Sequence, residues 1–259
     1  RNDWVVVSLM AGEDEVQAFV SLIREHAPVA SRIRSIEWSR SEAEEMDAFR
    51  IIASRNTSDE VTDISPDIAV CPQCLEDMRR QNHRINYPFV NCTHCGPRFS
   101  IIRDLPYDRP NTTMDEFPMC RICKEEYHDV DDRRFHAQPV ACNHCGPSYE
   151  YYQQGRIIRE MERMMPEIRK ALGKGRIIAI KGIGGFHLMC DATNEKAVAR
   201  LRRLKYRDAR PFACMFPDPE TLSDYAHLQE TDEKSLNSWR RPIVLLKMKK
   251  ELSPSVSMG

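Results

Sequence analysis

Eight of the ten cysteines fall into four Cys-x-x-Cys pairs, and this pattern constrains the fold more than any other feature of the sequence. The pairs are Cys71/Cys74, Cys92/Cys95, Cys120/Cys123 and Cys142/Cys145. Two thiolates separated by two residues can hold one metal ion from two sides of a tight turn. No basic and apolar leader opens the chain, so we expect metal binding in the reducing cytoplasm rather than disulfides in a secreted protein.

The four pairs form an internal repeat. The spacing is Cys-x2-Cys-x17-Cys-x2-Cys in the first copy and Cys-x2-Cys-x18-Cys-x2-Cys in the second, and the second pair of each copy reads Cys-x-His-Cys-Gly-Pro. Two copies of one unit explain this arrangement more simply than coincidence does. We therefore expect two sequential sites, each made by the four cysteines of one copy.

Four thiolates at this spacing are typical of structural zinc, which prefers a tetrahedron of protein ligands. Two zinc ions are predicted, with an iron–sulfur cluster as the alternative. We expect a hairpin to bring the two pairs of each site together, and Gly96 and Gly146 to permit the turn that follows each second pair. His94 and His144 are predicted to lie at the surface or beside the ligands, because four cysteines already complete each site.

The distribution of charge divides the chain into modules. Residues 1–65 carry 7 basic and 13 acidic side chains, residues 66–152 carry 10 and 13, and residues 153–259 carry 21 and 13, within a total charge of −1. Only the last segment should attract anions in general. The longest apolar runs fall far short of the roughly 20 residues that a membrane span requires, so a membrane partner is not expected.

Periodicity predicts the elements of the first segment. Apolar residues recur every three or four positions between 13 and 26, which favours a helix. Residues 4–9 and 48–53 are expected to form strands, and a polar linker should cover 57–65. About 55 residues are few for an independent hydrophobic core.

The last segment has the order of an α/β domain. A helix is predicted over 160–172, a buried strand over 176–181 and a second strand over 186–190. Thr193 is expected to cap a basic helix that runs to about residue 206.

Two features of this segment could bind an anion. A glycine-rich turn that contains Lys181, Gly184 and Gly185 would let backbone amides approach a phosphate, although it lacks the ordinary P-loop pattern. A basic run ends in Lys205 and Arg207, where the chain changes direction and could clamp a triphosphate. The alternative for the basic run is a solvated helix face, and spacing alone does not separate the two interpretations.

Four stretches of sequence are distinctive enough to compare with a known family. They are Tyr87-Pro-Phe-Val-Asn-Cys-Thr-His-Cys-Gly-Pro-Arg-Phe99, Leu105-Pro-Tyr-Asp-Arg-Pro110, Asp132-Arg-Arg-Phe-His-Ala-Gln-Pro-Val-Ala-Cys142 and Lys181-Gly-Ile-Gly-Gly-Phe-His-Leu-Met-Cys-Asp-Ala192. The first three resemble the hydrogenase-maturation carbamoyltransferase (HypF) family, and the fourth resembles the start of the YrdC-like domain of that family. The resemblance covers essentially the whole chain and is most specific from 64 to 215.

The resemblance implies an α+β multidomain fold. Residues 1–56 would be the C-terminal part of a ferredoxin-like acylphosphatase domain, followed by the linker at 57–65. Residues 66–152 would form a double zinc finger of two zinc-ribbon-like units, each with four cysteine ligands. Residues 153–259 would be the N-terminal part of an α/β YrdC-like nucleotide-binding domain.

The resemblance also implies an activity. The family uses carbamoyl phosphate and ATP, through carbamate and carbamoyl-adenylate, to carbamoylate the C-terminal cysteine of a partner maturation protein, and that group becomes the cyanide ligand of the nickel–iron centre. Lys205 and Arg207 match the Lys-x-Arg signature that contacts ATP in YrdC-like proteins. Asn2 would correspond to the catalytic asparagine of the acylphosphatase domain.

The sequence departs from the family pattern in three places. The acylphosphatase phosphate loop, the later Ser-x-Asn segment of the YrdC-like domain and the large C-terminal domain are not in these 259 residues. We therefore expect a fragment without activity of its own.

Two other classes of function are compatible with parts of this sequence. Zinc ribbons followed by a basic YrdC-like tRNA-modification domain could bind nucleic acid, but the acidic excess of residues 66–152 is a poor surface for phosphates. A chaperone-like cysteine-rich interaction domain could also carry four Cys-x-x-Cys pairs. That interpretation does not account for the glycine turn and the basic helix.

Overall fold

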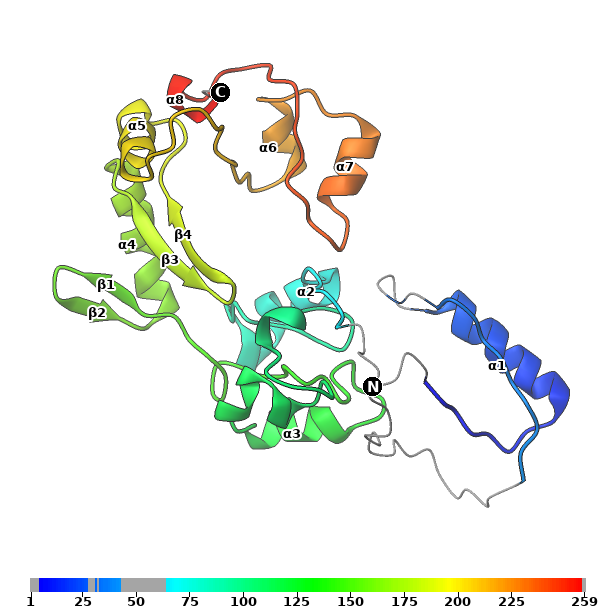
Figure 1. Cartoon of the computed structure of the whole chain (residues 1–259). Helices are drawn as coiled ribbons and strands as arrows, with labels where there is room; N and C mark the ends of the chain where they lie inside the picture. Colours follow the sequence, from blue (N-terminus) through cyan, green and yellow to red (C-terminus); the bar gives the residue numbers. More distant parts are fainter. Residues whose placement is uncertain (1–4, 28–30, 32, 43–63, 258–259) are drawn as a thin grey trace. The chain divides into compact units, whose positions relative to one another are not determined.

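The computed structural model describes residues 5–27, 31, 33–42 and 64–257 (Figure 1). The chain divides into two compact units, Arg1–Gly146 and Pro147–Gly259. Among the described residues, no helix has both the length and the apolar character needed to cross a membrane.

The first described element is helix α1, Glu13–Glu25, as the periodicity predicts. It begins where the Glu15 carboxylate accepts a 2.7 Å hydrogen bond from the backbone N–H of Gly12. The predicted strand at 4–9 is wrong over its described part, because Val5 and Val6 are 86% exposed and lie in irregular backbone. A run of valines forms a strand only beside another strand, and the described residues provide none there. The strand predicted at 48–53 lies outside the described residues.

A short helix, rather than the predicted hairpin, separates the two cysteine pairs of each copy. In the first copy this is α2, Pro72–Arg80, followed by the 3-10 turn Asn82–Arg84, and in the second copy it is α3, Arg121–His128. Cys71 is the N-cap of α2, and its Sγ accepts a 3.4 Å hydrogen bond from the N–H of Cys74. Proline at the first position and the good helix formers that follow it favour a helix here.

Three further 3-10 turns connect the two copies. They are Phe99–Ile101, Arg109–Asn111 and Thr113–Glu116. Cysteines belong to both apolar clusters of this unit. One cluster surrounds Cys74, Cys92 and Cys95, and the other surrounds Cys123 and Cys142, all of which are fully buried.

The second unit begins with two antiparallel hairpins (Figure 1). Strands β1 and β2 (Tyr151–Gln153 and Arg156–Ile158) form the first hairpin, and β3 and β4 (Ile178–Gly182 and Gly185–Met189) form the second. Helix α4, Met161–Gly173, lies between them in sequence. The helix and both strands predicted here are therefore confirmed, with ends shifted by one or two residues, but the strand predicted as buried alternates between half-buried and exposed residues.

Four helices complete the second unit: α5, Glu195–Leu204; α6, Pro219–Ser223; α7, Glu230–Leu236; and α8, Pro254–Ser257. The predicted cap of α5 is wrong by one residue. Asn194 caps the helix, since its Oδ1 accepts a 3.1 Å hydrogen bond from the N–H of Ala197. Thr193 instead donates its hydroxyl to the Asp191 carboxylate at 2.7 Å.

Candidate metal centres and a basic loop

The structure brings the eight paired cysteines together as two sequential clusters of four. One cluster holds Cys71, Cys74, Cys92 and Cys95, and the other holds Cys120, Cys123, Cys142 and Cys145. Within each cluster the four sulfurs all lie within 4.8 Å of one another. All eight cysteines are free thiols, as are Cys190 and Cys214 outside the clusters.

The distances between sulfurs fit a tetrahedral zinc ion. A Zn–S bond of about 2.3 Å places two sulfurs of a tetrahedron about 3.8 Å apart. The Sγ atom of Cys92 lies 3.8 Å from that of Cys71 and 3.7 Å from that of Cys95. In the second cluster the Sγ of Cys142 lies 3.7 Å from that of Cys120 and 3.8 Å from that of Cys145.

The chemistry of the donor set also fits a divalent cation. Hydrogen bonding to neighbouring thiols and burial raise the pKa of Cys74. Burial raises the pKa of Cys123, the charge of Arg84 acts in the opposite direction, and the charges of the neighbouring thiolates add to the increase. These two thiols therefore keep their protons until a cation replaces them, and a bound zinc ion does so. The residues present therefore fit the ion that the spacing predicts.

Backbone amides support the second pair of each cluster in the same way. The N–H of His94 donates to the Sγ of Cys92 at 3.4 Å, and the N–H of His144 donates to the Sγ of Cys142 at 3.4 Å. Both imidazoles are exposed, and neither belongs to a cluster. The two histidines thus contribute their backbone to the sites and their side chains to the surface, as predicted.

Both glycines that follow the second pairs are required, for different reasons. Gly96 has a φ of +101°, and a Cβ built on it would lie 2.6 Å from the Cβ of Asn91. A Cβ on Gly146 would lie 1.9 Å from the Tyr87 hydroxyl oxygen and 2.6 Å from the Cβ of Ala141. The turn of the second copy therefore packs directly against an aromatic residue of the first copy.

Replacing Gly146 with alanine is expected to lower the free energy of unfolding of the double finger by about 1–3 kcal/mol, because the new methyl group must displace the Tyr87 ring. The midpoint of urea unfolding, followed by zinc release, measures this change. Gly173→Ala is the matched control, since a Cβ there meets nothing within 4 Å. An unchanged midpoint for Gly146→Ala would show that a methyl group fits at this position without displacing the Tyr87 ring.

Arginines link the two copies, and sequence reasoning missed them. Arg84 is fully buried, and it donates to Glu126 Oε1 at 2.7 Å and to the carbonyl of Ala141 at 3.1 Å. Burial alone would raise the pKa of Glu126, but the hydrogen bonds and charge of Arg84 hold this pKa below its usual range. A buried ion pair of this kind joins the first copy to helix α3 of the second.

An arginine of the second copy makes the equivalent contact with the first copy. Arg134 donates to the Asp77 carboxylate on α2, and its Nε donates to the carbonyl of Asn91 at 3.1 Å. Arg134 stands 50 positions after Arg84, and Glu126 stands 49 after Asp77. The two copies therefore exchange equivalent contacts. The repeat offset, applied to all charged residues, could have revealed these pairs.

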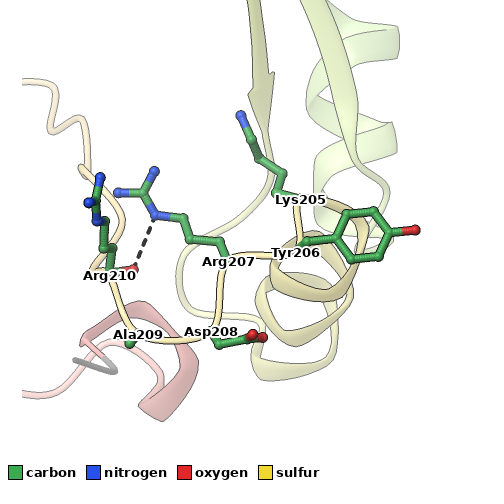
Figure 2. A pocket seen from close by; sticks show the side chains of 6 residues that line it. All are labelled: Lys205, Tyr206, Arg207, Asp208, Ala209 and Arg210. Carbon is green, nitrogen blue, oxygen red and sulfur yellow. Dashed lines mark hydrogen bonds between the residues drawn. The ribbon is translucent and has the colours of Figure 1, made fainter.

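A basic loop follows helix α5 in the second unit. Residues 205–210 line a hollow of about 370 Å³ (Figure 2). Lys205 and Arg207 point toward the same side of the loop, whereas Tyr206 points away from them. The Arg207 guanidinium donates to the carbonyls of Arg210 at 3.2 Å and Pro211 at 2.9 Å. The loop therefore presents two cations on one side, one of which also braces the backbone.

One arginine of the basic run holds this loop in place by hydrogen bonds to its backbone. Arg202 is buried, and it donates to the carbonyls of Arg207 at 2.6 Å, Arg210 at 3.1 Å and Ser255 at 2.6 Å. Its guanidinium also stacks 4.7 Å from the centre of the Phe212 ring. For this residue the interpretation as part of a solvated helix face is wrong, because the loop carbonyls need its donors.

The other predicted anion-binding residues lie in the turn between β3 and β4. Lys181 pairs with Phe186 across the hairpin, and its Nζ lies 5.8 Å from the centre of that ring. Gly185 has a φ of +128°, which suits a tight turn. Lys181, Gly184 and Gly185 are not among the residues that line the hollow at 205–210. Asn2 lies outside the described residues.

Comparisons with known proteins agree with both parts of this description. The HypF finger family matches residues 70–102 and 119–152, and the Sua5/YciO/YrdC family, described as telomere recombination, matches residues 170–259. A carbamoyltransferase HypF from Rhodobacter capsulatus is 41% identical over 93% of the chain and 32% of the relative. A probable carbamoyltransferase HypF from Methanocaldococcus jannaschii is 40% identical over 95% of the chain and 32% of the relative.

Solved structures give the same result. Full-length HypF in a phosphate- and nucleotide-bound form is 45% identical with a TM-score of 0.86, and it is matched over 95% of this chain and 32% of that one. HypF from T. kodakarensis is 42% identical with a TM-score of 0.82, over 96% of this chain and 32% of that one. The chain thus spans about a third of the length of the relatives it matches. We therefore identify it as a homologue of the HypF carbamoyltransferases over nearly its whole length, with the HypF finger and a Sua5/YciO/YrdC region.

Proposed function

We propose that this chain is part of an ATP-dependent carbamoyltransferase of hydrogenase maturation. The enzyme would use carbamoyl phosphate and ATP, through carbamoyl-adenylate, to carbamoylate the C-terminal cysteine of a partner protein. The observation that carries the proposal is 38–41% identity over at least 93% of the chain to proteins named carbamoyltransferase HypF. The relative whose structure is described as phosphate- and nucleotide-bound supports a nucleotide substrate.

Within this proposal the two units have different tasks. The double finger is a scaffold, because protein sulfur fills all four positions of each site and leaves none for a reacting water. The basic loop of the second unit is the place for ATP. Lys205 is exposed and Arg207 is half-buried, and both side chains point toward the same side of the loop (Figure 2). Two cations so placed can neutralise neighbouring phosphates.

The remaining assignments follow the same proposal. Lys181, Gly184 and Gly185 would approach the nucleotide from the β3–β4 turn, and Asn2 would belong to an acylphosphatase-like part. The proposed modules are 1–56, the linker 57–65, the double finger 66–152 and the nucleotide-binding region 153–259. Because the chain covers a third of its relatives, we expect carbamoyl transfer only from the longer protein.

Replacing Lys205 and Arg207 together with alanine is expected to weaken ATP binding by at least about tenfold. Each hydrogen bond to a charged group contributes about 1.5–3 kcal/mol, and about 1.4 kcal/mol corresponds to a factor of ten. Calorimetry with ATP measures the change in a carbamoyltransferase of full family length that carries this sequence. Zinc content should stay unchanged.

The control variant removes two charges from the same helix and loop region without touching the hollow. Arg200 and Arg203 are exposed on α5 and do not line it, so Arg200→Ala/Arg203→Ala should bind ATP as the unmodified protein does. Equal losses of ATP affinity in both double variants would assign the effect to the overall positive charge of this region. Unchanged ATP binding in the Lys205/Arg207 variant would remove these residues from the nucleotide site.

A further inference from the structure

Each metal cluster receives a hydrogen bond from an arginine of the other copy. The Nη2 of Arg84, in the first copy, lies 3.4 Å from the Sγ of Cys123 in the second cluster. The Nη1 of Arg133, in the second copy, lies 3.7 Å from the Sγ of Cys74 in the first cluster. We call Arg84 and Arg133 the crossed arginines. Both sulfur acceptors belong to the first Cys-x-x-Cys pair of their copy and lie at equivalent positions in the repeat.

The position of each crossed arginine depends on the metal site of its own copy. Arg84 ends the 3-10 turn after α2, and two residues later the N–H of Asn86 donates to the carbonyl of Met78 on α2 at 2.9 Å. Helix α2 begins at the cysteines Cys71 and Cys74. Loss of the zinc ion held by these cysteines would therefore release the helix, and Arg84 with it.

The second copy repeats this dependence. Three residues after Arg133, the N–H of His136 donates to the carbonyl of Tyr127 on α3 at 3.0 Å. Helix α3 begins at the cysteines Cys120 and Cys123. Asn86 and His136, 50 positions apart, both adopt a positive φ, at 58° and 51°, so the two arginine segments share one backbone path.

Backbone hydrogen bonds hold each arginine segment against the opposite site. The N–H of Thr93, beside the ligand Cys92, donates to the carbonyl of Arg133 at 3.1 Å. In the equivalent bond, the N–H of Asn143, beside the ligand Cys142, donates to the carbonyl of His83 at 3.0 Å. Each site therefore touches the other copy through a side chain on one cysteine pair and through the backbone at the other pair.

Electrostatics makes the crossed contact favourable only when the receiving site is formed. Four thiolates around one Zn²⁺ leave a net charge of −2, and an N–H donor from a guanidinium stabilises that charge. Groups that hydrogen-bond to metal ligands typically change metal affinity by about 10–100-fold when they are removed. Here the donor belongs to the other copy, so its benefit requires that both copies are folded.

From this arrangement we propose that the two zinc sites bind cooperatively, with Arg84 and Arg133 carrying the coupling. Filling one site positions the arginine that stabilises the other, and by reciprocity each ion tightens the binding of its neighbour. Each site of the double finger then holds its ion more tightly when the other site is filled, so the two fingers are not independent. This inference concerns zinc binding alone and does not depend on the proposed carbamoyl transfer.

The test measures which site opens first when zinc is withdrawn. The full chain, loaded with two zinc ions, is mixed with excess EDTA, and samples are alkylated at intervals with N-ethylmaleimide. Mass spectrometry of peptides then reports how fast each group of four cysteines becomes reactive. Arg133→Met is the main variant, because the Arg133 side chain is 30% exposed; the substitution also removes the ion pair of Arg133 with Asp77 on α2.

The proposal predicts a crossed result. In Arg133→Met the first cluster, 59 residues away in sequence from the substitution, should open about 10–100-fold faster than in the unmodified chain, and ahead of the second cluster. Arg133→Lys should give an intermediate rate, because it keeps the charge and loses the planar fork. Arg84→Lys should give the mirror result, in which the second cluster opens first.

The control removes an arginine beside a metal site without breaking a crossed contact. Arg121 is exposed on α3 next to the ligand Cys120, and it pairs with Glu125. Arg121→Met should leave both rates unchanged. Faster opening of the second cluster alone in Arg133→Met, or equal rates in that variant and the unmodified chain, would overturn the proposal.

Discussion

Replacing Cys92 with serine is expected to unfold the double finger. Cys92 is fully buried and belongs to the first apolar cluster, so the metal site and the core share this residue. Binding of structural zinc contributes about 10–16 kcal/mol in small metal-dependent domains, more than the total stability of most domains. The measurements are zinc content by mass spectrometry and protection of the remaining cysteines from alkylation.

The control for this variant is a cysteine outside both clusters. Cys214 is partly buried in the second unit, and burial raises the pKa of its thiol. Cys214→Ser should retain both zinc ions. Retention of both ions and of full cysteine protection in Cys92→Ser would contradict the assignment of Cys92 as a ligand.

Replacing Arg84 with methionine is expected to lower the free energy of unfolding by about 3–5 kcal/mol. The substitution leaves the largely buried Glu126 carboxylate without its cationic partner, and removing one member of a buried ion pair typically has this cost. Urea unfolding of the zinc-loaded chain measures the loss. Arg79→Met, which removes an exposed arginine from a 3.7 Å pair on α2, should change stability by less than about 1 kcal/mol.

A double variant separates the buried charge from the lost packing. Arg84→Met combined with Glu126→Leu replaces both charges by apolar groups, and it should recover part of the stability that Arg84→Met loses. If the stability lost in the double variant equals the sum of the losses in Arg84→Met and Glu126→Leu, then Arg84 and Glu126 act independently. The buried pair would then not be the link between the two copies.

The parts of this fold that could be predicted from sequence are those set by local pattern. The four Cys-x-x-Cys pairs and their repeat predict two sequential clusters, and the structure places the sulfurs accordingly. Apolar periodicity predicts α1, the glycines Gly173 and Gly175 mark the predicted end of α4, and the two strands predicted on either side of the glycine-rich turn are β3 and β4. Each of these features depends on residues close together in the chain.

Two of the three features that the sequence patterns did not predict depend on partners far away in sequence. The valines at 5–7 have the composition of a strand, but a strand needs a neighbour that composition does not supply. Metal-ligand spacing does not distinguish a helix from a hairpin between the pairs, and the helix-forming residues after Pro72 decide the matter locally. Arg202 looks like one member of a solvated charged run, yet it is buried because the carbonyls of residues 207, 210 and 255 converge on it.

The central claim is that two zinc ions, each held by four cysteines of one copy, form the framework of the first unit. Native mass spectrometry of the chain, combined with alkylation before the metal is removed, tests this claim most directly. The account predicts two zinc ions per chain, with Cys190 and Cys214 labelled and the eight clustered cysteines protected. One ion or none, iron in place of zinc, or labelling within a cluster of the metal-loaded chain would contradict it.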